Sequence, residues 1–289
     1  MNLQSLLVNE ETESIYKKIM DLNDLVWENK AADRLEGWLG NFKKEEEQKI
    51  ALYLLSKFTY YNESEIKSLM RTSYKLLENK VFLDLKGKMN LDDEYVVEKN
   101  CYFVGTWENP VKSGAHLLYH FAKINGLPED LFKNTIDDIP KSAKYVIFFD
   151  DMAGSGRQAS SFWFNRVVRE RKSLVNTKFY YLVLVANEKG ISYILNKTGL
   201  PVIPSVVLDR RYEIFSNNSI YFTNDNFKRK AAAMCKKYGE SLLPGDGLGF
   251  NNSQLLIGFH HNVPDNTLPI IWSEENEWNP IFPRNEVFV

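Results

Sequence analysis

Two adjacent acids and a short loop of small residues form the part of this sequence best suited to chemistry. A glycine loop at a helix N-terminus presents backbone N–H groups to a phosphate, and glycine lets the backbone approach an anion closely. Two neighbouring carboxylates repel one another, and a cation or sugar hydroxyls relieve that repulsion. The stretch therefore predicts a phosphate site beside an acid pair. The acids are Asp150 and Asp151, and the loop consists of Ala153, Gly154, Ser155, Gly156, Arg157 and Gln158.

The elements around this group are those of an α/β protein. Val146 to Phe149 are apolar and predict a buried strand, and the residues after Gln158 have helical spacing. Ligands of open α/β sheets bind at the carboxyl ends of the strands, which is where the acids stand. The structural alternative is that the acids only cap the helix and the glycines only turn the chain. Because strand, acids and loop occur together, we favour phosphate binding.

Two families with similar loops fit less well. A dinucleotide-binding fingerprint would read residues 154–159 as G-x-G-x-x-A, but it needs an acid about 20 residues further on. The next acid at a strand end, Glu188, is too far away. An S-adenosylmethionine-dependent amino-methyltransferase has a loop like DDMAGSGRQ, but its catalytic motif contains two consecutive prolines, and this chain has no Pro-Pro pair.

The third family fits best. Residues 146–158 resemble the signature of type I phosphoribosyltransferases for 5-phosphoribosyl 1-pyrophosphate (PRPP), which consists of four apolar residues, two acids and a Thr/Ser/Gly loop. The resemblance implies that Asp150 and Asp151 are catalytic and face the ribose hydroxyls. It also implies that the loop, with the Ser155 hydroxyl, holds the 5′-phosphate and that Mg²⁺ arrives with PRPP. Gly154 and Gln158 depart from the family pattern, which usually has Ala, Ser or Thr at the first place and a hydroxyl residue at the second.

A second loop stands where these enzymes bind pyrophosphate, after the first strand. Residues 95–105 predict that strand, and a helix closed by Gly126 follows the loop. Lys112 would supply positive charge, and the backbone N–H groups of Ser113 and Gly114 would donate hydrogen bonds. A lysine before a helix is common, so the alternative is an ordinary helix start.

The composition is that of an ordinary globular protein. The chain has 289 residues, 44% hydrophobic and 26% charged, with a net charge of −2, so no global attraction to nucleic acid or membrane follows. We expect no secretory signal and no membrane span. Cys101 and Cys235 are the only cysteines, which suits a reducing cytoplasm. His116 and His120 have metal-ligand spacing, but no third ligand is recognisable, so we expect packing residues.

The order of the segments predicts two regions. Residues 1–92 carry helical spacing and no chemical motif, and we expect them to dock a partner. Residues 93–289 alternate strands and helices, which predicts a type I phosphoribosyltransferase-like α/β domain with a mostly parallel sheet flanked by helices.

The C-terminal tail carries a more specific resemblance. It combines the apolar strand 255–259, the stretch HHNVPDNTLPIIW, Trp278 and a closing Ile-Phe-Pro-Arg at 281–284. These traits resemble phosphoribosyltransferase-like proteins of bacterial conflict systems (PRTase-CE-like effectors, retron-associated among them), which implies an anti-phage toxin effector. The tail would form a hood over the PRPP site. Trp272 is expected in the core, and the roles of His260 and His261 stay open.

Two hypotheses for function follow. In the first, the protein is a glycosyltransferase-class enzyme that transfers ribose 5-phosphate from Mg²⁺-PRPP, with Lys112 and Mg²⁺ stabilising the pyrophosphate. In the second, it is a non-catalytic module that senses PRPP or a nucleotide and switches a partner. A reverse transcriptase–RNA complex or another defence subunit is the expected partner, and direct nucleic-acid binding stays open.

Overall fold

The chain folds into two compact units. The computed structural model describes residues 9–85, 96–105, 113–171 and 174–284, with the side chains of residues 113–116 left undescribed. Unit 1 combines Met1–Ser64 with Asp209–Val289, and unit 2 is Glu65–Leu208. This division differs from the boundary expected near residue 92. The long helix that precedes residue 92 belongs to the α/β unit, and the C-terminal tail belongs to the same unit as the N-terminal helices.

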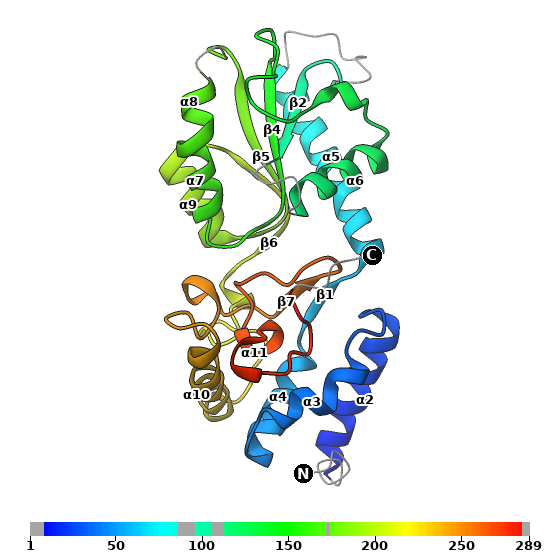
Figure 1. The fold of residues 1–289 in the computed structure, drawn as a ribbon, viewed down its shortest axis with the longest axis vertical. Helices are drawn as coiled ribbons and strands as arrows, with labels where there is room; N and C mark the ends of the chain where they lie inside the picture. The colour runs from blue at the N-terminus through cyan, green and yellow to red at the C-terminus, as the bar shows by residue number, and fades with distance from the viewer. Residues whose placement is uncertain (1–8, 86–95, 106–112, 172–173, 285–289) are drawn as a thin grey trace. The chain divides into compact units, whose positions relative to one another are not determined.

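Unit 2 is built on a five-stranded parallel sheet (Figure 1). Its strand order is β3-β2-β4-β5-β6, and every neighbouring pair is parallel. The central strands are buried on both faces, which explains their continuous apolar sequences. The α/β, mostly parallel fold class is thereby confirmed. The strands are β2 (Cys101–Gly105), β3 (Phe132–Lys133), β4 (Tyr145–Ala153), β5 (Lys178–Asn187) and β6 (Val202–Leu208).

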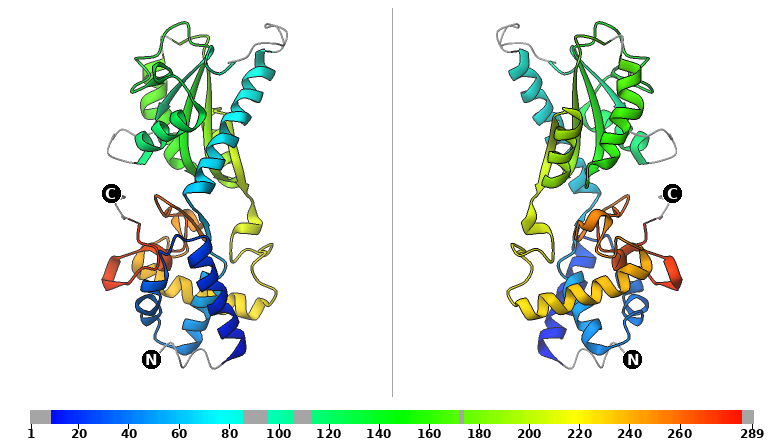
Figure 2. Two further views of the ribbon diagram at one scale, coloured as in Figure 1. Left: turned by 90° about the vertical axis from the view of Figure 1, so that its right-hand side faces the viewer. Right: turned by 90° about the vertical axis from the view of Figure 1, so that its left-hand side faces the viewer.

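Helices cover both faces of this sheet (Figures 1 and 2). On one face lie α7 (Arg157–Phe162), a π-helical segment (Trp163–Val167), α8 (Val168–Glu170) and α9 (Glu188–Thr198). The other face carries α5 (Glu63–Leu85) and α6 (Ser113–Asn125).

Neighbouring residues of β4 show this two-sided covering. Phe148 packs on Phe162 of α7, with ring centroids 5.2 Å apart, whereas Phe149 packs on Phe121 of α6 at 4.4 Å. Their side chains point to opposite faces because successive residues of a strand alternate.

Polar contacts explain why α5 belongs to the α/β unit. The Ser73 and Ser205 hydroxyls lie 2.6 Å apart, which ties the helix to β6. Near its end, Asp84 accepts a hydrogen bond from the Tyr180 hydroxyl of β5. Sequence spacing indicated the helix correctly, but these partners lie about a hundred or more residues away along the chain, so spacing alone could not assign it to the sheet.

Unit 1 brings the two ends of the sequence into one core. Parallel strands β1 (Thr59–Tyr61) and β7 (Ile257–Phe259) pair and lie side by side in Figure 1. The indole N–H of Trp38 donates to the Ile270 carbonyl at 2.7 Å. Helices of the unit are α2 (Glu10–Leu25), α3 (Leu35–Gly40), α4 (Glu45–Leu55), α10 (Asp225–Leu242) and α11 (Pro269–Trp272), with short 3₁₀ turns at Ala32–Arg34, Arg210–Tyr212, Phe250–Asn252 and Glu275–Glu277.

Trp272 is buried, as expected, and its indole N–H donates to the Thr267 carbonyl at 2.9 Å. None of the helices that the structure describes is long and apolar enough to cross a membrane.

Candidate functional site

The strand order of unit 2 reverses between β2 and β4. After β2 the chain forms β3 on one side, and from β4 onward it adds β5 and β6 on the other side. Open α/β sheets bind ligands at such a switch point, outside the carboxyl ends of the two strands. Gly105, the last residue of β2, pairs with Phe149 of β4, so β4 continues with Asp150 and Asp151 beyond the end of its neighbour.

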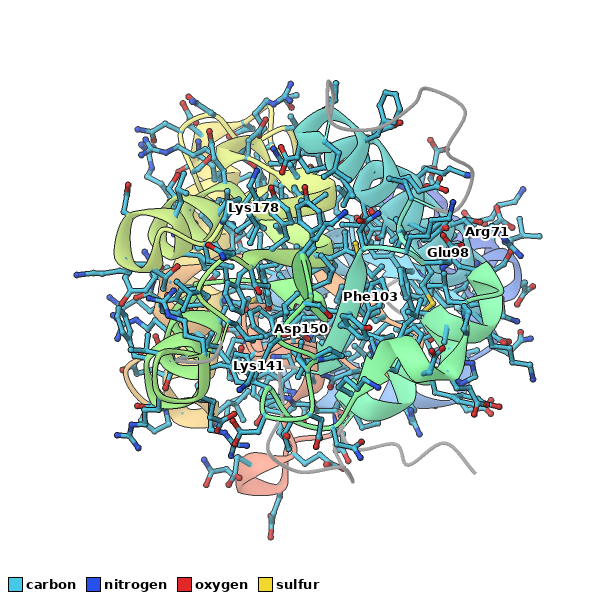
Figure 3. The ribbon with its side chains drawn as sticks, turned by 90° about the horizontal axis from the view of Figure 1, so that it is seen from above. Arg71, Glu98, Phe103, Lys141, Asp150 and Lys178 are labelled. Carbon is cyan, nitrogen blue, oxygen red and sulfur yellow. The ribbon has the colours of Figure 1, made fainter. Side chains whose placement is uncertain are left out.

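The two acids belong to β4 itself. The sequence predicted a strand that ends at Phe149, but β4 continues to Ala153 because its last residues pair with β5. Asp150 is only 2% exposed, whereas Asp151 is half-buried. Figure 3 shows Asp150 among the strands in the interior of unit 2.

Hydrogen bonds from β4 and β5 hold Asp150. The Tyr181 hydroxyl of β5 donates to its Oδ2 at 2.7 Å, and the backbone N–H of Asp151 donates to its Oδ1 at 2.9 Å. The acids therefore lie together, as their adjacency suggested, but Asp151 is the one with exposed surface.

The environment of Asp150 favours its neutral form. Burial raises the pKa of this carboxyl to about 8, and the negative charge of Asp151 adds to the shift, which the Tyr181 hydroxyl partly offsets. At neutral pH a protonated Asp150 can share its proton with Asp151. The pair then presents a single negative charge, placed at the carboxyl end of the central strand.

The glycines of the loop are required for packing within the protein. Gly156 precedes α7 with φ of 74°, a conformation that favours glycine. A Cβ at Gly156 would lie 2.6 Å from the Gly190 carbonyl oxygen, and a Cβ at Gly190 would lie 2.3 Å from that of Gly154. The loop thus rests directly on the first turn of α9. The sequence had assigned these glycines to the approach of an anion and had not indicated Gly190.

The loop leads into a helix start that can receive an anion. The first N–H groups of a helix have no acceptor within the helix. The N–H of Ser160 bonds back to the Gly156 carbonyl at 3.1 Å, and that of Arg157 approaches the Ser155 hydroxyl at 3.4 Å. Gly154 and Ser155 are half-buried, whereas Arg157 and Gln158 are exposed and Ala153 is buried.

The second predicted loop is described only from Ser113 onward. Lys112 lies outside the described residues, and Ser113 and Gly114 form the first turn of α6, the helix that follows β2. The helices α6 and α7 thus follow the two strands of the switch point, β2 and β4. His120 of α6 packs its ring on Tyr119, and the described residues contain no group of three metal-ligating side chains.

A surface hollow that the sequence did not indicate lies beside the ends of β2 and β3. Its walls include Gly105, Thr135 and Phe162, together with Arg166 and Glu170, whose side chains pair at 2.9 Å. The residues come from three separate segments of the chain, so no local motif indicates the hollow. One of its walls is Gly105, which pairs with Phe149, the residue directly before the acid pair.

The match to a protein-family model agrees with the sequence resemblance. No curated protein matched the chain. Among solved structures, it is similar to orotate phosphoribosyltransferase from Aeropyrum pernix, with 20% identity, a TM-score of 0.28, and coverage of 46% of this chain and 75% of that chain. It is also similar to the AQ2163 protein from Aquifex aeolicus, with 16% identity, a TM-score of 0.33, and coverage of 51% of this chain and 77% of that chain. A family model described as PRTase-CE matches residues 35–284, most of the sequence, and the chain therefore belongs to the PRTase-CE family.

Proposed function

We propose that unit 2 binds Mg²⁺-PRPP at the carboxyl edge of its sheet and transfers ribose 5-phosphate to an acceptor. The observation that carries this proposal is the half-buried Asp151, which stands at the switch point directly before a glycine loop and a helix start. An acid for the ribose and N–H groups for the 5′-phosphate are thus a few residues apart. The family to which the chain belongs supports the same assignment.

In this reaction the bond between ribose C1 and pyrophosphate breaks, and C1 forms a bond to a nucleophile that gives up a proton. Positive charge develops on the ribose as the pyrophosphate leaves. The charge of Asp151 stabilises that state electrostatically, while Asp150 and Tyr181 fix its position. Mg²⁺ neutralises the leaving pyrophosphate, and we assign Lys112 and the N-terminus of α6 to the same task.

We further propose that the protein is a cytoplasmic toxin effector of an anti-phage defence system such as a retron. Family membership and the tail motifs support this role. Unit 1 would dock the partner, a reverse transcriptase–RNA complex or another subunit. A truncation at residue 92 cannot test this idea, because it removes β1, the partner of β7, and α5, which packs on the sheet.

A sensor without turnover is the second candidate. The observation in its favour is the burial of Asp150, whose carboxyl oxygens already accept bonds from Tyr181 and from the Asp151 backbone. A sensor would use the same loop to bind PRPP or a nucleotide and would need only one accessible acid.

Ligand binding tests the site shared by both candidates. Mg²⁺-PRPP should raise the melting temperature of the full chain, because only the folded loop binds it. Ser155→Asp should abolish the shift, since it adds negative charge where the phosphate is expected. Asp130→Asn, on an exposed turn of unit 2, is the matched control and should respond like the wild type. If S-adenosylmethionine raises the melting temperature and PRPP does not, the methyltransferase hypothesis would replace this proposal.

A further inference from the structure

The loop after β4 rests on a residue of α9 that has no side chain. Gly190 is buried in the first turn of this helix. A Cβ atom at Gly190 would lie 2.3 Å from the carbonyl oxygen of Gly154 and 2.8 Å from that of Ala153. Both contacts are with backbone atoms and are too short for any side chain, so only glycine allows the loop to lie where it does.

This contact determines which way two peptide units of the loop face. The Gly154 carbonyl oxygen is nearer to the Cβ position of Gly190 than its carbon is, at 2.3 Å against 3.1 Å, so the carbonyl group points toward α9. The Ala153 carbonyl oxygen approaches the same point. In a planar trans peptide unit the N–H points opposite to the C=O. Because the described peptide bonds are all trans, the N–H groups of Gly154 and Ser155 point away from α9.

A second contact holds the loop on the other side of Ser155. A Cβ atom at Gly156 would lie 2.6 Å from the Gly190 carbonyl oxygen and 2.9 Å from the Cγ1 atom of Ile194, one turn further along α9. Ser155 thus stands between two glycines that both pack on the same helix. Because the loop is held on both sides of Ser155, its peptide units keep the orientation that Gly190 sets.

The N–H groups of the loop have no acceptor in the part of the chain that the structure describes. The backbone nitrogens of Gly154, Ser155 and Gly156 form no hydrogen bond to the described residues. Gly154 and Ser155 are only half-buried, so the loop keeps surface on which a ligand can bind. Backbone N–H groups need acceptors, and successive ones in a loop form a concave site for an anion. The loop therefore presents donors to an anion, with its carbonyl oxygens turned away.

We infer that Gly190 is a positioning residue for the phosphate of a sugar phosphate. Without a side chain, it lets α9 hold the carbonyl groups of Ala153 and Gly154, and it thereby directs the N–H groups of the loop to the phosphate. A side chain at this position would push the carbonyl groups off the helix and move the donors out of line. The inference rests on the proposed function, because the phosphate binds in the same loop. It adds a residue of another element that acts through the loop and does not itself touch the ligand.

Calorimetric titration of the full chain with ribose 5-phosphate tests this role. Gly190→Ala should weaken binding by about tenfold or more, equivalent to about 1.4 kcal/mol, which is close to the worth of one charge-assisted hydrogen bond. The matched control is Gly199→Ala at the other end of α9, where φ is 70° and an added Cβ would meet nothing within 4 Å. This control strains the same helix without touching the loop, so it should bind like the wild type.

Amide NMR reports on the loop directly, which a general loss of stability would not mimic. Ribose 5-phosphate should shift the amide signals of Gly154 and Ser155 in the wild type and in Gly199→Ala, because these N–H groups donate to the phosphate. At the same ligand concentration the signals should stay in place in Gly190→Ala. Ile194→Ala adds no atoms but removes the second contact of the loop, so we expect it to weaken binding several-fold.

The outcomes separate this inference from the proposed function. If the wild type does not bind ribose 5-phosphate, or binds it with the loop amides unmoved, the phosphate does not lie in this loop and both are overturned. If the wild type binds through the loop and a folded Gly190→Ala protein binds as tightly, only the role of Gly190 is refuted. Equal weakening by Gly199→Ala refutes that role too. Thermal melting shows which variants are folded, and if Gly190→Ala is not, unchanged binding by Ile194→Ala decides against the inference.

Discussion

Replacing Asp150 with asparagine should make the protein more stable at alkaline pH. The change removes an ionisable carboxyl from a site that is 2% exposed and keeps its shape. The asparagine oxygen can accept from the Asp151 backbone N–H, and its amide group can donate to the Tyr181 hydroxyl oxygen. The wild type, in contrast, must place a second negative charge beside Asp151 as Asp150 ionises.

The size of this effect follows from the pKa. Burial and the charge of Asp151 raise the pKa of Asp150 to about 8 from the usual 3.8. Between these values the folded chain holds a proton that the unfolded chain has released, so the free energy of unfolding falls as pH rises. From pH 5 to pH 8 the expected loss is about 3–4 kcal/mol, at about 1.4 kcal/mol per pH unit.

Urea unfolding at pH 5 and pH 8 measures this loss. Asp150→Asn should be within about 2 kcal/mol of the wild type at pH 5 and should exceed it at pH 8. Asp130→Asn, an exposed control, should follow the wild type at both values. Parallel pH dependence of Asp150→Asn and the wild type would refute a raised Asp150 pKa and, with it, the shared proton.

Two further substitutions test the surroundings of the acid pair. Gly156→Ala should destabilise the chain by about 2–4 kcal/mol, because it adds a backbone clash to the cost of a positive φ. The control Gly199→Ala, at a glycine with φ of 70° and open space around it, should cost only about 1 kcal/mol. Equal losses of stability in melting experiments on the two variants would disprove the packing of Gly156 on Gly190. Tyr181→Phe removes a hydrogen bond that lowers the pKa of Asp150, so in the same urea assay the loss of stability should continue to a higher pH than in the wild type. If the loss ends at the same pH in both proteins, that result would count against the bond.

Local pattern was sufficient to predict the central elements of unit 2. The apolar run before Asp150 and the glycine loop after it follow each other in sequence, so their strand–loop–helix order could be predicted from spacing. The position of the loop at the carboxyl edge also followed, because a parallel sheet presents all its βα loops there.

Contacts between distant residues could not be predicted in this way. Tyr181 lies within an apolar run, and only the register of β4 and β5 brings its hydroxyl to Asp150. Gly190 resembles an ordinary helix residue until the loop 154–156 is seen to rest on it. The pairing of β1 with β7 joins segments almost 200 residues apart, so the helical N-terminus and the tail looked like separate regions.

Turnover of PRPP is the most direct test of the central claim that unit 2 is a transferase. Pyrophosphate release would be measured with Mg²⁺-PRPP, the full chain and a cell extract as the source of acceptors. We expect release by the wild type and by Asp130→Asn, and a loss of about 10²–10³-fold in Asp151→Asn with PRPP binding retained. PRPP binding without pyrophosphate release, or release that is unchanged in a folded Asp151→Asn protein, would contradict catalysis by this acid pair.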